Sequence, residues 1–417
     1  MELTKTKYKQ TEVGLIPEDW AFDIIGDQID LLTGFPFPSS KYSSDGIRLL
    51  KGANVKRGET DWQDKLVTYW NEDINKYKQF ELQADDLVIA MDGSLVGRSY
   101  ALISTADLPA ILLQRVARIR SKKIDIKFLK FFVGSDWFVK YCDSVKTVTA
   151  IPHISPKDIR CFKIPLPPTL TEQKAIATAL CDVDELIANL DKLLTKKKAI
   201  KQGAMQQLLT PPHKGGKRLV GFTGEWVEKK LGEVAQMNSG GTPSSKVSEY
   251  YNGDINWVSI TDMTNTGKYI ISSGKKITEE GLHNSSARLF PKDTVLLAMY
   301  ASIGKCTIAK AKVTTSQAIL GITVNNSLDI EYLYYYLIYK KDELISQGQQ
   351  GTQSNLNKGM VQNIIMCLPQ IKEQNAIAKI LSDMDSEIEQ LETKKSKYGD
   401  IKQGMMQELL TGKTRLV

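Results

Sequence analysis

The sequence predicts an α+β fold: two strand-rich mixed domains separated by two long antiparallel helices, a coiled-coil spacer, in a pseudo-two-fold internal repeat. Three observations lead to this prediction. Residues 170–210 align with residues 371–411 without a gap, and about half of the positions are identical. Both copies carry apolar side chains at steps of three and four, which is typical of a helix. Short apolar or β-branched runs precede each copy and are separated by Gly, Asn, Asp and Ser, which is typical of strands.

The 417 residues are too many for one ordinary core, because single cores stop growing near ~250 to 300 residues. Neither a secretion signal nor an apolar run of about 20 residues is visible, so a cytoplasmic location is expected. The net charge of +7 weakly favours an anionic partner such as DNA. Five cysteines without a CxxC pair argue against a disulfide framework or a zinc cluster, and buried free thiols are expected instead.

The first domain is expected over residues 1–165. Its strand-like runs include IRLLKGAN from Ile47 and LVIAM from Leu87. Hydrophobic runs of this length with turn residues on both sides predict buried strands. One helical stretch, FLKFFVGSDWFVKYC from Phe128, ends the domain.

The second domain, expected over residues 211–367, repeats this order weakly. Trp20 and Trp226 each follow an acidic residue, and DLVIAM from Asp86 is matched by TVLLAM from Thr294. A tyrosine-rich helical stretch, EYLYYYLIYKKDELIS, ends this domain as well. The chain therefore reads as domain, helix, domain, helix.

The two repeated segments lie within residues 166–210 and 368–417. Each is expected to contain one long helix that starts after a Leu-Pro turn, near Thr171 and Lys372. A helix of about 39 residues would be about 58 Å long, and its apolar stripe needs a partner. The other copy is the favoured partner, and the alternative is that each helix packs on its own domain.

The apolar stripe is interrupted at the lysine runs that start at Lys196 and Lys394. It is expected to resume at Ile200, Ala204 and Leu208 in the first copy and at Ile401, Met405 and Leu409 in the second. A glycine within a helix costs about 1 kcal/mol relative to alanine, so the repeated IKQG predicts a close contact or a bend. The residues predicted to form the spacer and to dock partners are Ile176, Leu180, Val183, Ile187, Leu190, Gly203, Ile377, Leu381, Met384, Ile388, Leu391 and Gly404.

The sequence contains few groups that could carry out catalysis. It has no GxxxxGK[ST] phosphate loop, no GxGxxG turn and no HExxH or CxxC metal spacing. His153 and His283 are interpreted as turn residues, because no partner that would make either one a general base can be named. Any catalysis associated with this chain is therefore expected in another chain, and no metal site is predicted.

Residues that could bind DNA are more numerous. Arg and Lys can neutralise phosphates, and Arg, Asn and Gln can read base edges. The candidates in the first domain are Lys41, Arg48, Lys51, Asn54, Lys56, Arg57, Arg98 and Arg115, with further basic residues at Arg118, Arg120, Lys122 and Lys123. The candidates in the second domain are Ser244, Ser245, Lys246, Tyr250, Trp257, Ser259, Lys275, Lys305, Gln353 and Asn355. Ordinary polar loops are an equally good explanation for the second set.

Several segments together resemble the specificity (S) subunit of type I restriction-modification systems. They are LPPTLTEQKAIA and LPQIKEQNAIA at the helix starts, IKQGxMQxLLT at the helix ends, and GTPSSKVSEYYNGDINWV in the second domain. The resemblance covers essentially the whole chain. The first domain differs in the last of these motifs and reads GFPFPSSKYSSDGIRLLKG, which suggests that the two domains read different sequences.

The resemblance implies that residues 1–165 and 211–367 are target-recognition domains, each binding one half of a bipartite, asymmetric DNA site. It implies that residues 166–210 and 368–417 are conserved spacer helices, the second with a tail. Two modification subunits that methylate adenine with S-adenosylmethionine, and restriction subunits that use ATP and Mg, are the implied partners. No cofactor is implied for this chain itself. The alternatives are a non-catalytic scaffold or adaptor that binds proteins through its paired helices and, with the least support, an enzyme.

Overall fold

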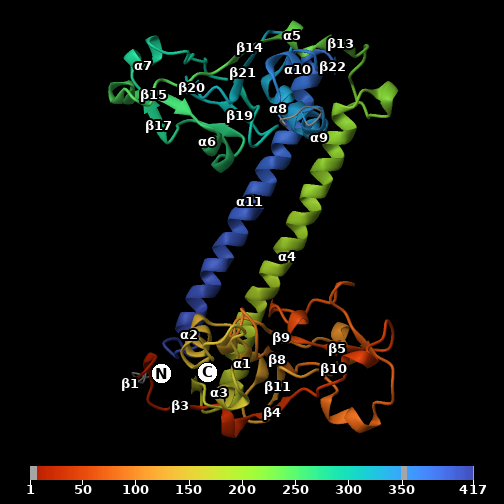
Figure 1. The fold of residues 1–417 in the computed structure, drawn as a ribbon, viewed down its shortest axis with the longest axis vertical. Helices are drawn as coiled ribbons and strands as arrows, with labels where there is room; N and C mark the ends of the chain where they lie inside the picture. Colours follow the sequence, from red (N-terminus) through yellow and green to blue (C-terminus); the bar gives the residue numbers. More distant parts are fainter. Residues whose placement is uncertain (1–6, 349–354, 417) are drawn as a thin grey trace, which may run out of the picture. The chain divides into compact units, whose positions relative to one another are not determined.

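The computed structural model describes residues 7–348 and 355–416 of the chain. The chain forms two compact units, and each one is described by itself. The first unit consists of Met1–Asp191 and Lys394–Val417, and the second consists of Lys192–Thr393. Both boundaries fall inside the long helices, so each unit contains a strand-rich domain, the start of one long helix and the end of the other (Figure 1).

The two long helices are α4 (Leu170–Leu209) and α11 (Ile371–Leu409). They begin within one residue of the predicted starts, directly after a Leu-Pro segment, because proline disfavours a helical conformation in the residue before it. No helix among the residues that the structure describes is long and apolar enough to cross a membrane.

In the described part of the first unit, the strands form a five-stranded sheet (β4-β11-β8-β9-β6), a three-stranded sheet (β10-β5-β7) and the two-stranded pairs β1-β2 and β12-β3. The strands are β1 (Tyr8–Thr11), β2 (Gly14–Pro17), β3 (Ala21–Ile24), β4 (Asp30–Thr33), β5 (Ile47–Leu50), β6 (Arg57–Gly58), β7 (Tyr69–Trp70), β8 (Leu87–Ala90), β9 (Tyr100–Leu102), β10 (Ala110–Leu112), β11 (Val116–Arg120) and β12 (Lys163–Leu166). The shorter helices are α1 (Ile126–Val133), α2 (Asp136–Val145) and α3 (Pro156–Arg160).

The described part of the second unit has the same sheet order, with β14-β21-β18-β19-β16, β17-β15-β20 and the pair β13-β22. Its strands are β13 (Val227–Lys230), β14 (Ala235–Ser239), β15 (Tyr251–Val258), β16 (Tyr269–Ile270), β17 (Lys275–Ile277), β18 (Val295–Ala298), β19 (Cys306–Ala309), β20 (Thr314–Thr315), β21 (Ile319–Val324) and β22 (Ile365–Leu368). Its shorter helices are α5 (Leu231–Val234), α6 (Ile260–Asn265), α7 (Glu279–His283), α8 (Ile330–Tyr339), α9 (Lys341–Gly348) and α10 (Lys358–Gln362).

The strand pairing confirms that the two halves are structural repeats. Val116 of β11 lies opposite Ala90 of β8, and Ile319 of β21 lies opposite Ala298 of β18 in the same antiparallel arrangement. The buried strands β8 and β18 are the matched DLVIAM and TVLLAM segments of the sequence. Register therefore defines equivalent positions in the two domains, including positions where the sequences differ.

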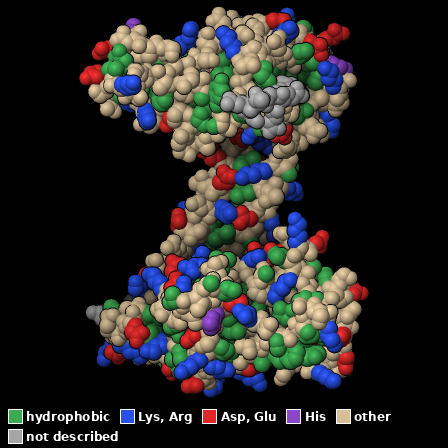
Figure 2. Space-filling model, viewed as in Figure 1, with side chains coloured by type: hydrophobic (Ala, Val, Ile, Leu, Met, Phe, Trp, Pro, Cys, Tyr) green, Lys and Arg blue, Asp and Glu red, His purple; other side chains and the backbone are tan. Residues whose placement is uncertain are grey.

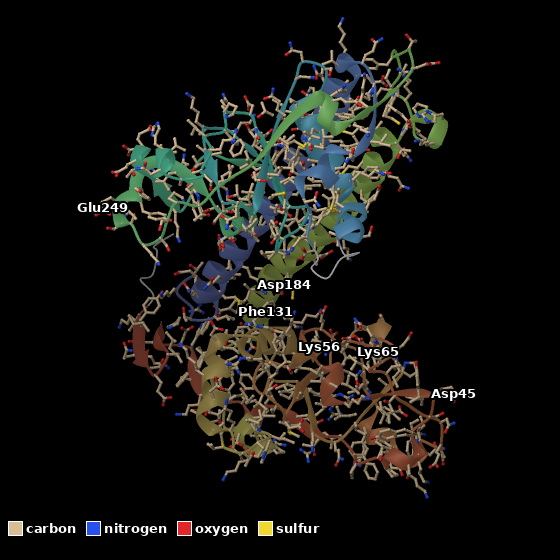
Figure 3. All side chains as sticks on the ribbon, turned by 45° about the horizontal axis from the view of Figure 1, so that its top comes forward. Asp45, Lys56, Lys65, Phe131, Asp184 and Glu249 are labelled. Carbon is tan, nitrogen blue, oxygen red and sulfur yellow. The ribbon has the colours of Figure 1, made fainter. Side chains whose placement is uncertain are left out.

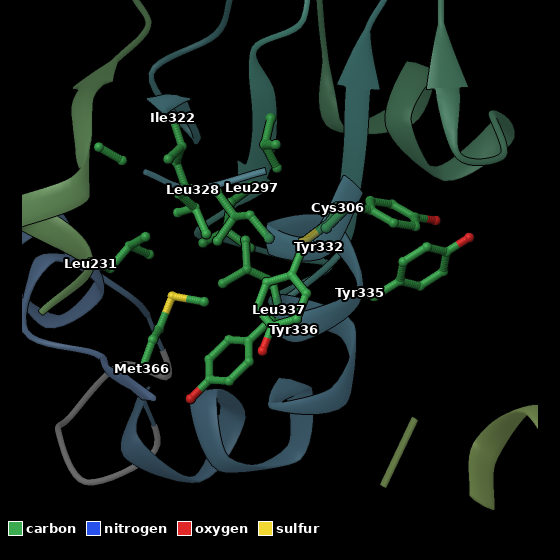
Figure 4. Packing of buried hydrophobic residues seen from close by; sticks show 14 of the residues in the cluster. Leu231, Leu297, Cys306, Ile322, Leu328, Tyr332, Tyr335, Tyr336, Leu337 and Met366 are labelled. Carbon is green, nitrogen blue, oxygen red and sulfur yellow. The ribbon is translucent and has the colours of Figure 1, made fainter. Parts of the chain in front are cut away.

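Each domain is completed by the start of one long helix and the end of the other. In the first unit, Ile176 and Leu180 at the start of α4 share a core with Leu409 at the end of α11. In the second unit, Ile377 and Leu381 at the start of α11 share a core with other buried residues that include Leu209. Figure 4 shows the interior of that second core, where Leu297 and Ile322 from the sheet meet the tyrosines and Leu337 of α8. Each long helix therefore packs both on the other long helix and on a domain, so both of the predicted alternatives occur.

The predicted continuation of the apolar stripe is wrong at two positions. Ile200 is 47% exposed and Ile401 is 40% exposed. Met205 and Leu209 are buried instead, because they pack in the core of the second unit, which also includes Ile377 of α11.

The cysteines follow the prediction only in part. Cys142, Cys306 and Cys367 are buried, whereas Cys181 is half-buried and Cys161 is exposed. Burial raises the pKa of Cys142 and of Cys306 to about 12, so both thiols stay protonated at neutral pH.

Two equivalent glycines directly follow the edge strands β4 and β14, Gly34 in the first domain and Gly240 in the second. A Cβ atom on Gly34 would lie 2.1 Å from the carbonyl oxygen of Leu113, and one on Gly240 would lie 2.1 Å from Oγ1 and 2.2 Å from the carbonyl oxygen of Thr315. Each glycine also donates its N–H to the same sheet position, the carbonyl of Val116 or of Ile319. Only glycine allows this close approach of two backbone segments.

We expect Gly34→Ala to lower the free energy of unfolding of the first unit by about 3 kcal/mol, because backbone atoms cannot move aside for the methyl group. Gly203→Ala in α4 is the matched control. Nothing lies within 4 Å of a Cβ atom at Gly203, so this change is expected to stabilise the helix by up to about 1 kcal/mol. Urea unfolding measures both, and equal effects of the two changes would contradict the predicted steric clash.

Candidate nucleic-acid interface

Two glutamines, 201 residues apart, fix the long helices to the domains. Gln173 accepts a hydrogen bond from the backbone N–H of Asp125 (2.9 Å), the residue that caps α1. Gln374 accepts one from the N–H of Asp329 (2.9 Å), which caps α8. Both glutamines are buried, and each donates to the carbonyl of a proline just before its own helix. The first turn of each long helix is therefore bonded to the residue that caps a shorter helix of a domain, α1 in the first unit and α8 in the second.

A second repeated contact joins the end of one long helix to the start of the other. In the first unit, Arg415 beyond α11 forms a bidentate ion pair with Glu172 of α4 (Nη2–Oε2 2.8 Å). Its guanidinium also contacts both carboxylate oxygens of Asp19 (3.0 and 3.1 Å) and lies over the ring of Trp20. Hydrogen bonds to Glu172 and Asp19 raise the pKa of Arg415, so the guanidinium stays charged.

The second unit contains the same arrangement. Arg218 beyond α4 forms a bidentate pair with Glu373 of α11 (3.2 and 2.7 Å) and donates to the carbonyl of Gly224. We call the two pairs, Arg415–Glu172 and Arg218–Glu373, the helix clasps. Each glutamate side chain is only 1% exposed. Sequence reasoning missed them, although KRLV from Lys217 and TRLV from Thr414 extend the repeat beyond the helices.

Ion pairs between α4 and α11 confirm that the helices are antiparallel. In the first unit Lys395 pairs with Asp191 and Lys402 pairs with Asp184, both at 2.5 Å. Residue numbers rise along one helix as they fall along the other, which only an antiparallel pair allows. The pairs in the second unit join Lys197 to Glu387, Lys198 to Glu392 and Lys201 to Asp385.

One of these pairs is itself repeated. Asp184–Lys402 in the first unit has the same positions in the 201-residue repeat as Asp385–Lys201 in the second. The lysine in each case also lies over an aromatic ring of a shorter helix, Phe131 of α1 for Lys402 (5.8 Å) and Tyr335 of α8 for Lys201 (5.5 Å). Figure 3 labels Phe131 and Asp184 in the first unit.

The predicted spacer residues are placed as follows. Ile176, Leu180, Leu190, Ile377, Leu381 and Ile388 are buried, and Val183, Ile187, Met384 and Leu391 are half-buried. A close contact or a bend was predicted at Gly203 and Gly404. Nothing lies within 4 Å of a Cβ atom at either glycine, and both helices continue through them. The prediction that the glycines mark a close contact within this chain is therefore wrong.

Four candidates in the first domain are exposed or half-exposed at the surface. Arg57 forms a loose ion pair with Asp136 (3.9 Å), and Arg115 forms a hydrogen-bonded ion pair with Asp92 (3.0 Å). Lys41 pairs with Glu72, and Lys56 lies 3.8 Å from a carboxylate oxygen of Asp61. Exposed pairs of this kind contribute little to stability, so the basic groups can exchange their partners for phosphates.

Other candidates in the first domain bond within the domain. Asn54 is fully buried, and its amide donates to the carbonyls of Asp61 (2.9 Å) and Leu66 (3.3 Å). Arg48 donates to two backbone carbonyls, and Lys51 donates to a threonine hydroxyl (2.7 Å). Because Asn54 has no exposed surface, we leave it out of the proposed DNA-binding set.

The remaining basic residues of this domain also fall into two groups, those that bond within the domain and those that are exposed. Arg118 is buried beside Asp30, and burial lowers its pKa. Arg120 forms a bidentate pair with Asp86, and Arg98 pairs with Asp143 (3.1 Å). Lys122 and Lys123 are exposed. Figure 2 shows basic and acidic side chains intermixed over the visible face of the first unit, so exposure of individual groups defines the candidates better than overall charge.

In the second domain, Ser244, Ser245, Lys246 and Lys275 are exposed and Tyr250 is half-exposed. Trp257 is buried and donates to the carbonyl of Gly241 (2.9 Å). Ser259 caps α6 by accepting from the N–H of Asp262, and Lys305 donates to the carbonyl of Thr266 (3.1 Å). We leave Trp257 out of the proposed set because it is buried. Asn355 is half-exposed, and Gln353 lies outside the described residues.

Within residues 7–348 and 355–416, no three His, Cys, Asp or Glu side chains are arranged to hold a metal ion. His153 is exposed and its ring Nδ1 lies 2.9 Å from the hydroxyl of Thr147, and His283 lies 2.7 Å from the carbonyl of Glu279 in the same short helix. His153 therefore makes the local contact that is expected of a turn residue, whereas His283 is the last residue of the short helix α7.

Comparisons with known proteins match this chain over both of its halves. The family model described as the type I restriction modification DNA specificity domain matches residues 17–202 and again residues 223–397. The chain is 35% identical over 208 residues to the MjaVIII specificity subunit of Methanocaldococcus jannaschii, which is 49% of this chain and 48% of that protein. It is 34% identical over 191 residues to the EcoAI specificity subunit of Escherichia coli, 45% of this chain and 31% of that protein.

The chain thus spans about half or less of the length of these curated relatives. A longer but weaker match, 22% identical, links it to the EcoBI specificity subunit of Escherichia coli over 87% of this chain and 79% of that protein.

Two solved structures share the fold. The S subunit of a type I restriction-modification system from M. genitalium aligns with a TM-score of 0.62 and 17% identity, over 94% of this chain and 96% of that chain. A structure that describes complex assembly and conformational transition of the type I R-M system aligns with a TM-score of 0.59 and 17% identity, over 96% and 99%. Since the family model matches both repeats and covers well over half of the residues, the chain belongs to the type I restriction-modification DNA specificity family.

Proposed function

We propose that this chain is the DNA sequence-specificity subunit of a type I restriction-modification complex, in which each strand-rich domain binds one half of a bipartite, asymmetric DNA site. The observation that carries the proposal is the repetition of one sheet order in two domains whose loop sequences differ. A repeated frame presents two binding surfaces in the same way, while different side chains on the two frames recognise different bases.

The repeated helices support the proposal of two identical modification subunits as partners. Each helix start carries the same buried Glu-Gln pair, and each helix end carries the same IKQG segment with an open glycine. Two equivalent faces on one chain suit two copies of one partner, because each copy then makes the same contacts. Restriction subunits are further proposed partners of the assembled complex.

Adenine methylation with S-adenosylmethionine and ATP-dependent cleavage with Mg are proposed to belong to those partner subunits, and this chain is proposed to hold no cofactor. The relatives are named specificity subunits, which does not favour the alternative of a stand-alone scaffold. DNA binding by exposed Lys and Arg side chains should weaken steeply with salt, because phosphate contacts release counterions. Protein or sugar binding by a scaffold would depend far less on salt.

Adenine-methylation mapping tests the proposal in a host that produces the full chain with its modification subunit. We expect one bipartite motif with two unlike half-sites. Exchanging residues 1–165 for those of another specificity subunit should then change one half-site and leave the other unchanged, since the second domain is retained. The proposal fails if no bipartite motif is methylated, or if the exchange changes both half-sites.

A further inference from the structure

Three loops that are far apart in the sequence are bonded together at one place on the first domain. The N–H of Met91 donates to the carbonyl of Arg115 (2.9 Å), and the N–H of Ile154 donates to the carbonyl of Met91 (2.9 Å). The N–H of Gly93 donates to the carbonyl of Pro152 (3.0 Å). We call residues 92–95, 114–115 and 147–153 the three-loop surface. Backbone hydrogen bonds hold its parts in fixed positions, as a recognition surface requires.

The three-loop surface exposes three large apolar side chains. Val148 is fully exposed, and Ile151 and Leu95 are each more than half exposed. A single exposed apolar residue needs no explanation, but three on mutually bonded loops form a feature that suggests binding.

Basic side chains lie beside the apolar ones. Arg115 belongs to the surface itself, and Lys146 directly precedes the loop of residues 147–153. The two neighbouring carboxylates are already engaged, because Asp92 pairs with Arg115 and Asp143 pairs with Lys146 and also with Arg98. Arg115 and Lys146, together with the exposed apolar side chains, favour an occupant that combines negative charge with flat apolar groups, and duplex DNA has both.

Arg115 has the properties of a base-reading residue. Its backbone φ is 68°, in the left-handed region that non-glycine residues adopt rarely, and its side chain is 63% exposed. Such backbone conformations cost energy and occur most often at functional sites. The carboxylate of Asp92, 3.0 Å from Nη1, restricts the guanidinium before any ligand is bound. An arginine oriented in this way can donate two hydrogen bonds to the O6 and N7 atoms of guanine.

The second domain has the same frame with different side chains. The N–H of Met299 donates to the carbonyl of Ala318 (2.9 Å), and the N–H of Leu356 donates to the carbonyl of Met299 (3.0 Å). By strand register, Ala318 occupies the position of Arg115, and Tyr300 that of Asp92. The arginine and its carboxylate partner are thus replaced together while the frame is retained. This is the pattern expected where two domains of one fold read different bases.

We propose that the three-loop surface reads bases of the half-site bound by the first domain. This inference rests on the proposed function above. Arg115 contacts a guanine in the major groove, and the exposed Val148 and Ile151 pack on neighbouring base edges, with the methyl group of thymine as the best apolar partner. Arg115 and its loops therefore determine sequence, whereas exposed lysines elsewhere on the domain bind phosphates without distinguishing bases.

The test is selection from a randomised duplex pool by the full chain assembled with its modification subunit. We expect Arg115→Ala to reduce discrimination at one G·C position of one half-site by about 10- to 100-fold, with the other half-site unchanged. The double variant Val148→Ser, Ile151→Ser should reduce discrimination at a neighbouring position of the same half-site. All of these side chains are exposed, so the thermal unfolding of each variant should match that of the wild-type chain.

Arg57→Ala is the matched control, because Arg57 is equally exposed (64%) and also has one aspartate partner. It should leave the selected sequence unchanged, whatever its effect on affinity. If the wild-type complex selects no sequence, the proposed function fails. If the wild-type complex selects a bipartite sequence and Arg115→Ala selects the same one with equal discrimination, only the present inference is overturned. It is also overturned if the variants weaken assembly with the modification subunit while the complex that still assembles keeps the wild-type sequence preference, because the surface would then bind protein.

Discussion

Arg218→Ala is expected to lower the free energy of unfolding of the second unit by about 3 kcal/mol. The substitution removes the only guanidinium that forms an ion pair with Glu373 among the described residues, and that carboxylate is 1% exposed. Removing one partner of a buried ion pair typically costs 3 to 5 kcal/mol, roughly, because the remaining charge is desolvated without compensation. Arg218 is itself partly exposed, which places the expected loss at the lower end of that range.

Lys379→Ala provides the control, because Lys379 lies on α11, the helix that carries Glu373. Lys379 also pairs with a carboxylate, that of Asp383, but both side chains are about two-thirds exposed or more. Pairs of this kind contribute about 0.3 to 0.5 kcal/mol. The double variant Arg218→Met, Glu373→Leu should be less destabilising than Arg218→Ala alone, since it leaves no unpaired charge.

Urea unfolding gives the free energies, and amide hydrogen exchange at the start of α11 shows where stability is lost. Exchange should accelerate in the first turns of α11 in Arg218→Ala and not in Lys379→Ala. An effect of Arg218→Ala no larger than that of Lys379→Ala would show that the helix clasp does not hold the end of α4 to the start of α11.

The clasps also show where sequence reasoning reaches its limit. The two long helices could be predicted to within one residue at their starts, because a periodic apolar pattern and a proline are local signals. Glu373 and Arg218 are 155 residues apart, and Glu172 and Arg415 are 243 apart. Nothing local says that these side chains meet. The matching KRLV and TRLV segments extend the repeat beyond each helix, but they do not show which residues the two arginines contact.

The prediction of DNA-binding residues from the sequence was limited for a different reason. Residue type alone does not distinguish an asparagine that reads a base from one that closes a loop, and Asn54 holds a loop within the domain. Arg115 was predicted as a contact, but its left-handed backbone and its bond to Asp92 depend on tertiary structure. The matched DLVIAM and TVLLAM segments already align Asp92 with Tyr300, whereas the equivalence of Arg115 and Ala318 became visible only through the strand register.

Inserting seven residues into both long helices is expected to lengthen the non-specific gap of the DNA target. The insertions belong between Leu194 and Thr195 in α4 and between Thr393 and Lys394 in α11. These points lie between the ion pair of Asp191 with Lys395 and the pair of Lys198 with Glu392, so every interhelical pair is retained. Seven residues make nearly two full turns, so the apolar stripe keeps its face with a drift of about 20°.

Each helix would become about 10 Å longer, which equals the rise of about three base pairs. Three base pairs also turn the DNA by almost a third of a revolution, whereas the helix pair turns far less, so each added base pair carries a cost in twist. We therefore expect methylation mapping to show a gap longer by one to three base pairs, with both half-sites unchanged.

Inserting seven residues into α4 alone is the control. It would shift one set of ion pairs by two turns relative to its partners, and specific methylation should be lost. An unchanged gap with the double insertion would mean that the helices do not set the distance between the half-sites, and the spacing would then have to come from the partner subunits.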